Sequence, residues 1–241
     1  MPDDRYRLSF DSVADVYERS RPPYAPDALA WIAERLPLHR VLDLGAGTGK
    51  LTRQLVALGA EVIAVEPGDE MRRVLQSVLL EVEALAGSAE AIPLPDTSVD
   101  AVTVGQAFHW FRTSDALREM YRVLRPGGGF ALLWNEWDDD DPLMHALNQI
   151  VESLRPDGSR GDRQRDEVWA SPLFSGHERR TFGHAEQLPA EVAVQRVSSV
   201  SAMAAAEPEE RQHALAAVRK LVGRAMVVFP MTTTVFAADR A

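Results

Sequence analysis

The chain has 241 residues, 46% of them hydrophobic, and a formal net charge of −10 at pH 7. This length suits one α/β domain, and the acidic balance argues against DNA or RNA as the main partner, because phosphate binding depends largely on Lys and Arg. The sequence has no cysteine, which excludes disulfides, a thiol nucleophile and a cysteine-based zinc site. No apolar run approaches the roughly 18–20 residues of a membrane span, and the N-terminus does not resemble a signal peptide, so a soluble cytoplasmic protein is predicted.

The first 25 residues are polar with scattered aromatic side chains. Residues 11–19 can form a short helix, which the prolines at 22 and 23 end. Pro26 suits the first turn of a second helix, whose apolar face extends to Leu36.

The next stretch, from Val41 to Thr52, reads Val-Leu-Asp-Leu-Gly-Ala-Gly-Thr-Gly-Lys-Leu-Thr. Its apolar start predicts a buried strand, its three glycines predict a turn, and residues 52–58 predict an amphipathic helix. A helix N-terminus behind glycines presents unpaired N–H groups to a polar ligand. A P-loop fits poorly, because Leu44 stands in place of the first glycine and Leu51 in place of Ser or Thr. The dinucleotide pattern G-x-G-x-x-G also fails, since Lys50 occupies its last position.

A second strand is predicted over Glu61–Glu66, and it ends in an acid 21 residues after Gly45. This is the spacing of a carboxylate that accepts hydrogen bonds from two ribose hydroxyls. A helix from residue 67 to about residue 80 and a short strand over residues 82–86 follow.

The fourth strand is predicted over residues 99–104, and Gly105–Phe111 follows it at the edge where open α/β sheets bind ligands. A helix from Thr113 or Ser114 is expected to end at Arg125–Gly129, before a fifth strand over Phe130–Trp134. Beyond residue 135 we expect helices over residues 142–154, 190–201 and 208–222, a charged mobile loop over 155–167, and strands over 177–187 and 227–237.

Several of these blocks, in this order, resemble the class I S-adenosylmethionine (SAM)-dependent methyltransferases, in a type 11-like, trans-aconitate methyltransferase-like small-molecule branch. They are Leu42–Gly49, the acid Glu66, Gly87–Pro95 and Gln106–Trp110. The resemblance implies an α/β fold, with a Rossmann-like, doubly wound, mostly parallel seven-stranded sheet, helices on both faces and an antiparallel last strand. It also implies one domain over residues 1–241, with an N-terminal lid (1–25), a SAM-binding core (26–135), a substrate-shaping region (136–225) and the last strand (226–241).

The same resemblance implies that SAM is the methyl donor and S-adenosylhomocysteine the product. Tyr17 and Arg21 become candidates for the methionine carboxylate, Glu66 for the ribose, and Met71 for packing on the adenine. Ser88 stands where relatives carry an aspartate that accepts from the adenine amino group, and its hydroxyl would do this more weakly. The expected cofactor contacts are Tyr17, Arg21, Asp43, Gly45, Ala46, Gly47, Glu66, Pro67, Met71, Ser88, Ala89, Gln106 and Ala107.

Methyl transfer from a sulfonium requires that donor and acceptor be close, aligned and dry, and it needs neither a metal nor a nucleophilic side chain. A general base helps when the acceptor is a hydroxyl or an amine, and His109 is the candidate because it follows the fourth strand. The alternative is that His109 shapes the pocket wall. The expected acceptor pocket is Tyr24, His109, Trp110, Trp134 and Trp137, and the other histidines show no metal-ligand spacing.

The sequence therefore predicts a SAM-dependent methyltransferase acting on a small molecule, with O-methylation favoured and the acceptor open. We expect a monomer or homodimer without nucleic acid or a membrane span. Two alternatives stay open: a catalytically silent SAM-binding or scaffold protein, and a nicotinamide-dependent oxidoreductase, which shares the strand, turn, helix and distal acid.

Overall fold

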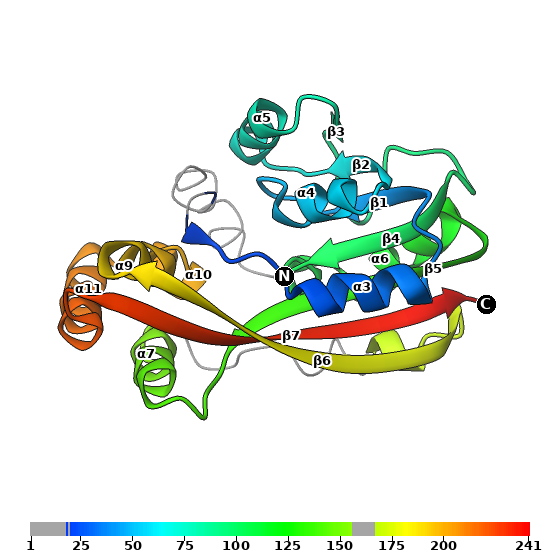
Figure 1. Cartoon of the computed structure of the whole chain (residues 1–241). Coiled ribbons are helices and arrows are strands. Elements are labelled where there is room, and N and C mark those ends of the chain that lie inside the picture. Colours follow the sequence, from blue (N-terminus) through cyan, green and yellow to red (C-terminus); the bar gives the residue numbers. More distant parts are fainter. Residues whose placement is uncertain (1–17, 19, 156–166) are drawn as a thin grey trace. The chain divides into compact units, whose positions relative to one another are not determined.

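The computed structural model describes residues 18, 20–155 and 167–241 (Figure 1). The helix expected over residues 11–19 and the loop expected over 155–167 therefore lie almost entirely outside the described residues. The chain divides into two compact units. The sheet unit comprises Pro23–Trp134, Arg160–Phe182 and Thr233–Ala241, and the helical unit comprises Met1–Pro22, Asn135–Ser159 and Gly183–Thr232.

Seven strands form one sheet, as predicted, and their order is β3-β2-β1-β4-β5-β7-β6. Neighbouring strands from β3 to β5 are parallel, and β7 runs in the opposite direction to β4 (Figure 1). The strands are β1 (Arg40–Leu44), β2 (Glu61–Val65), β3 (Glu83–Leu85), β4 (Val99–Gly105), β5 (Leu124–Trp137), β6 (Phe174–Pro189) and β7 (Met226–Arg240).

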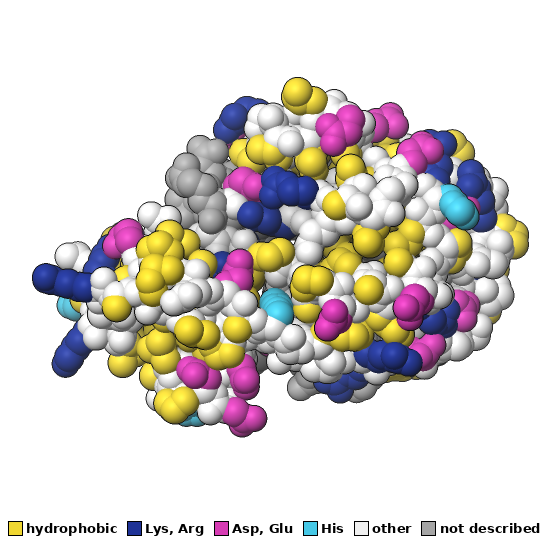
Figure 2. Space-filling model, viewed as in Figure 1, with side chains coloured by type: hydrophobic (Ala, Val, Ile, Leu, Met, Phe, Trp, Pro, Cys, Tyr) yellow, Lys and Arg dark blue, Asp and Glu magenta, His cyan; other side chains and the backbone are white. Residues whose placement is uncertain are grey.

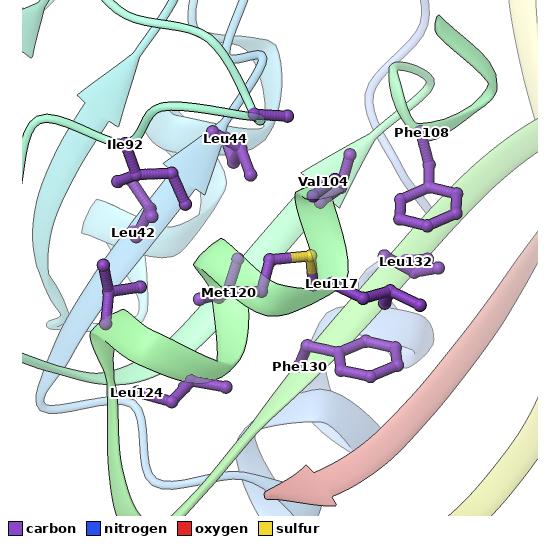
Figure 3. Packing of buried hydrophobic residues seen from close by; sticks show 14 of the residues in the cluster. Leu42, Leu44, Ile92, Val104, Phe108, Leu117, Met120, Leu124, Phe130 and Leu132 are labelled. Atoms are coloured by element: carbon purple, nitrogen blue, oxygen red, sulfur yellow. The ribbon is translucent and has the colours of Figure 1, made fainter. Parts of the chain in front are cut away.

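Helices cover both faces of the sheet, because side chains along each buried strand alternate between the two faces. Leu42 and Leu44 of β1 pack with Leu117 and Met120 of α6, as Figure 3 shows, whereas Val41 packs on the opposite face with α3 and α4. The helices of the sheet unit are α3 (Pro26–Arg35), α4 (Lys50–Ala57), α5 (Asp69–Val78), the short 3₁₀ helix η2 (Phe108–Trp110) and α6 (Thr113–Val123).

Strand β5 is longer than predicted. The glycines before Phe130 were expected to end a helix, but α6 ends at Val123 and β5 already begins at Leu124. A Cβ at Gly128 would lie 2.4 Å from the carbonyl oxygen of Asp100, and one at Gly129 would lie 2.5 Å from that of Ala238. These glycines therefore belong to the strand, because neighbouring backbones approach too closely for a side chain.

The helical unit has an apolar core of its own, which includes Met144, Leu147, Val197, Val218 and Phe229. Its helices are α7 (Pro142–Glu152), α9 (Ala190–Ser198), α10 (Ser201–Ala205) and α11 (Pro208–Val222). The helix predicted over residues 190–201 thus ends earlier, at Ser198, and a further short helix begins at Ser201. Among the described residues, no helix is both long enough and apolar enough to cross a membrane.

Candidate functional site

The candidate site lies at the carboxyl ends of the parallel strands of the sheet unit. The chain leaves β1 toward β2 and β3 on one side and returns to β4 on the other, so the strand order reverses between β1 and β4. Ligands of open α/β sheets bind at such a reversal. The register pairs Leu44 with Val65 and Val65 with Leu85, which places the residues after these three strands side by side.

The glycine turn after β1 has the backbone that the sequence predicts. Gly45, Gly47 and Gly49 have φ angles of +70°, +57° and +87°, which favour glycine. A Cβ at Gly45 would lie 2.7 Å from the Cβ of Ala107, so this glycine allows the turn to pack against the segment after β4. A Cβ at Gly47, in contrast, would meet no heavy atom within 4 Å. The backbone of Gly47 therefore borders open space.

Glu66 connects the glycine turn to the start of α5. Its Oε2 accepts a hydrogen bond from the Gly47 N–H at 2.9 Å, and its Oε1 accepts one from the Gly68 N–H at 2.8 Å. Behind it, Arg72 donates to the carbonyl oxygens of Glu66 and Pro67. Each oxygen of a carboxylate has two lone pairs and can accept more than one hydrogen bond.

Asp43 stabilises the elements on both sides of the glycine turn. The carboxyl group is buried and accepts a hydrogen bond from the Thr52 hydroxyl at 2.6 Å, which ties β1 to α4. Burial raises the pKa of Asp43 to about 7, although hydrogen bonds from Thr52 and Thr103 oppose this shift. Asp43 therefore titrates near neutral pH.

The block after β3 forms a compact turn. The Ser88 carbonyl accepts from the Ala91 N–H at 3.2 Å, and Ala89 is buried. The Glu90 carboxylate accepts from the Arg112 N–H at 2.8 Å. This bond joins the block to the segment that follows β4.

The segment after β4 has a conformation that the sequence does not reveal. Gln106 has φ +57°, an uncommon value for a residue with a side chain, and its N–H donates to the Leu133 carbonyl at 2.9 Å. Such outliers concentrate at functional sites. His109 follows in η2, half-buried, with its ring centroid 4.7 Å from that of Trp110.

Three other predicted residues of the sheet unit lie in its packed interior or at its margin. Met71 is buried in α5, and Tyr24 is buried with its hydroxyl 2.4 Å from where a Cβ on Gly105 would lie. Trp134 is partly buried, with its ring edge-to-face against Phe236 at 5.6 Å.

The remaining predicted residues do not belong to the described part of the sheet unit. Arg21 belongs to the helical unit, where it donates to the Ser199 carbonyl at 2.8 Å. Trp137 belongs to the same unit and packs edge-to-face against Phe229 at 5.7 Å. Tyr17 lies outside the described residues. The sheet unit thus holds Tyr24, Asp43, Gly45, Ala46, Gly47, Glu66, Pro67, Met71, Ser88, Ala89, Gln106, Ala107, His109, Trp110 and Trp134.

One aromatic residue near Trp134 was missed by the sequence reasoning. The ring centroid of Trp169 lies 5.8 Å from that of Phe236 and 4.7 Å from that of His177. No motif marks Trp169, because it follows a charged stretch without periodicity. It extends the aromatic cluster that Trp134 and Phe236 begin.

The face drawn in Figure 2 carries side chains of both charges. On the face drawn in Figure 2, Lys and Arg side chains alternate with acids and form no continuous basic surface. Within the part of the chain that the structure describes, no three or more His, Asp and Glu side chains are placed to hold a metal ion.

The strand order, the glycine turn and the distal acid are those of a Rossmann-like methyltransferase fold. Comparisons with known proteins lead to the same class. A family model described as a methyltransferase domain matches residues 42–132. An uncharacterized methyltransferase of Mycobacterium tuberculosis is 41% identical over 215 residues, which cover 89% of this chain and 86% of the relative. The structure of a proposed type II methyltransferase from Anaeromyxobacter dehalogenans, 24% identical, has a TM-score of 0.69 and covers 91% of this chain and 97% of its own.

The name of a further relative states the reaction that this relative catalyses. The malonyl-[acyl-carrier protein] O-methyltransferase of Methylococcus capsulatus is 44% identical over 101 residues, which cover 39% of this chain and 37% of the relative. Taken together, these findings show that the chain belongs to the class I SAM-dependent methyltransferase family.

Proposed function

We propose that the chain binds SAM at the glycine turn and transfers its methyl group to a small-molecule acceptor. The observation that carries this proposal is the pair of hydrogen bonds that the N–H groups of Gly47 and Gly68 donate to the Glu66 carboxylate. The backbone of Gly47 borders open space, so a ligand can approach it without displacing protein atoms. A carboxylate beside such an opening suits a ribose with two neighbouring hydroxyls.

Other residues at the same edge would complete the cofactor site. Ser88 and Ala89 follow the strand next to Glu66, where a hydroxyl acceptor and a backbone N–H would recognise the adenine. Gln106 and Ala107 adjoin the turn on its other side, since Ala107 lies against Gly45. Asp43 would act indirectly, by holding the turn in place from within the core.

SAM, when bound, would supply a methyl group already activated by the positive sulfur. The task of the protein is then to align the acceptor with that methyl group and to exclude water. Trp110 and Trp134 would provide apolar walls, and aromatic faces also favour a sulfonium. In this proposal residues 26–135 hold the cofactor.

Oxygen is the acceptor atom that the relatives support, over the limited region that they share with this chain. The M. capsulatus protein is named an O-methyltransferase, and its similarity covers 39% of this chain. A carboxylate acceptor needs no base, whereas a hydroxyl would give up its proton to His109. A His109→Asn variant separates the two cases: loss of kcat by about 10²–10⁴ at unchanged SAM affinity indicates a base, whereas a changed acceptor KM alone indicates a pocket wall.

Titration calorimetry with SAM, S-adenosylhomocysteine and NAD tests the cofactor. We expect heat from the first two and none from NAD. The Gly47→Val variant should abolish the heat, because its side chain would fill the space beside the backbone. Gly59→Val is the matched control, since Gly59 also has positive φ (+88°) and open space around its Cβ position but lies at the far end of α4.

The cofactor assignment would be contradicted if Gly47→Val and Gly59→Val bound SAM equally well, or if the protein bound NAD alone. Catalysis is tested separately, by incubating the protein with methyl-labelled SAM and a pool of small metabolites. Label in a small molecule supports the enzyme, whereas binding of SAM without any transfer favours the silent binding protein.

A further inference from the structure

We infer that Arg122 and Glu119 of α6 are positioning residues that fix residues 88–94, the segment proposed to recognise the adenine ring. The inference rests on the proposed function. In it, these two residues determine how strongly the site prefers adenine, because they hold the segment that would contact the ring. Neither residue borders the glycine turn, so neither is expected to touch the cofactor.

Arg122 joins several points of the backbone after β3. Its Nη2 donates to the Ile92 carbonyl at 2.9 Å, and its Nη1 donates to the Leu94 carbonyl at 2.8 Å. The same guanidinium contacts the Asp96 carboxylate at 2.8 Å and Glu119 through Nε at 2.7 Å. Only a planar fork of donors can satisfy acceptors in so many directions, which is a property of arginine and not of lysine.

Glu119 holds the same peptide from its other side. Its Oε2 accepts from the Ile92 N–H at 2.8 Å and from Arg122 Nη2 at 2.8 Å. The hydrogen bond from Arg122 is the main cause that lowers the pKa of Glu119, so the pair stays ionised at neutral pH. Ile92 thus has both its N–H and its carbonyl bonded to one ion pair.

A fixed Ile92 also fixes Ser88 and Ala89. The turn bond between the Ser88 carbonyl and the Ala91 N–H closes the segment immediately before Ile92. At the start of the segment Gly87 packs closely on Pro93, since a Cβ on Gly87 would lie 2.6 Å from the Cδ of Pro93. The segment is therefore held at both ends.

This pair differs from an ordinary surface ion pair on the same helix. Arg118 and Asp115 have the same spacing of three residues, but their side chains contact each other at the surface. The side chains of Arg122 and Glu119 are only 30% and 21% exposed and they bond to backbone. A loop that is held before the ligand arrives loses less entropy on binding, so its hydrogen bonds contribute more to affinity.

The test compares two ligands that differ only where the segment is proposed to act. S-inosylhomocysteine has a carbonyl oxygen in place of the adenine amino group of S-adenosylhomocysteine. Their dissociation constants, measured by calorimetry, give a preference ratio for the wild type and for Arg122→Gln, Glu119→Gln and Arg122→Lys. Arg118→Gln is the matched control, and thermal midpoints without ligand report folding.

We expect the wild type to prefer S-adenosylhomocysteine. Arg122→Gln and Glu119→Gln should weaken the binding of S-adenosylhomocysteine by about ten-fold, which is the scale of one hydrogen bond. The loss of affinity for S-inosylhomocysteine should be much smaller, so the preference for S-adenosylhomocysteine falls. Arg122→Lys should give an intermediate ratio, and Arg118→Gln should match the wild type.

Three results would overturn the inference: a wild type that does not distinguish the two ligands, variants whose ratio is unchanged even when their thermal midpoint drops, or an equal change in Arg118→Gln. Failure of the wild type to bind S-adenosylhomocysteine at all would instead overturn the proposed function. The two failures are therefore distinguishable.

Discussion

The buried carboxyl group of Asp43 leads to a quantitative prediction of how the free energy of unfolding depends on pH. Burial raises its pKa from the ordinary value of 3.8 to about 7. An acid with a higher pKa in the folded state takes up a proton on folding between those two pH values. Stability therefore falls as the pH rises through 7, and becomes constant above about pH 8 as far as this group is concerned.

The magnitude follows from the size of the shift. Between pH 5 and pH 6 the folded state holds nearly one more proton at Asp43 than the unfolded state, and at pH 7 about half a proton more, so the rise from pH 5 to pH 8 removes roughly 3 kcal/mol of stability. Asp43→Asn is neutral at every pH, and its amide oxygen can still accept from the Thr52 hydroxyl. The free energy of unfolding of the wild type minus that of Asp43→Asn should thus fall by about 3 kcal/mol from pH 5 to pH 8.

Urea unfolding of both proteins at pH 5, 6, 7 and 8 measures this difference, and the subtraction removes the other titrating groups. Asp100→Asn is the control. Although burial raises the pKa of Asp100, hydrogen bonds from Arg125 and from the Arg40 N–H lower it overall. Its difference from wild type should be constant from pH 5 to pH 8, and a constant difference for Asp43→Asn as well would refute the reasoning.

Two predictions concern the structural core of the sheet unit. Arg35 donates to two carboxylates and to the Gly176 carbonyl, with its side chain 18% exposed, so Arg35→Gln should cost about 1–3 kcal/mol in urea unfolding. Arg73, whose pair with an acid is exposed, is the control and its Gln variant should stay within about 0.5 kcal/mol of wild type. Phe130→Ala should lower the free energy of unfolding by about 3–5 kcal/mol, because Phe130 is one of the largest fully buried side chains. Leu80→Ala, at a position 86% exposed, is the control and should be near neutral. A smaller loss of stability for Phe130→Ala than for Leu80→Ala would contradict the packing argument.

The features that the sequence predicted correctly are those that depend on short-range pattern. The glycine turn and Glu66 follow apolar strands at fixed spacing, so their positions at adjoining strand ends come from the parallel topology. The alternation of Val41 and Leu42 between the two faces of the sheet follows from strand geometry alone.

The features that were missed depend on contacts between distant residues or on backbone conformation. Gly128 and Gly129 were interpreted as the end of a helix, because nothing local reveals the approach of Asp100 and of Ala238. The positive φ of Gln106 has no residue-type signal. Arg122 reaches back about thirty residues to the Ile92 carbonyl, and such long-range side-chain bonds leave no periodic trace in the sequence.

The two amide hydrogen bonds to Glu66 have a consequence for molecular recognition. A free glutamate side chain samples many rotamers, and immobilising it during association costs about 0.5–1.5 kcal/mol. In this protein the N–H groups of Gly47 and Gly68 hold the carboxylate. The two backbone donors orient the carboxylate when the chain folds, so a ligand that bonds to Glu66 would not have to immobilise its side chain.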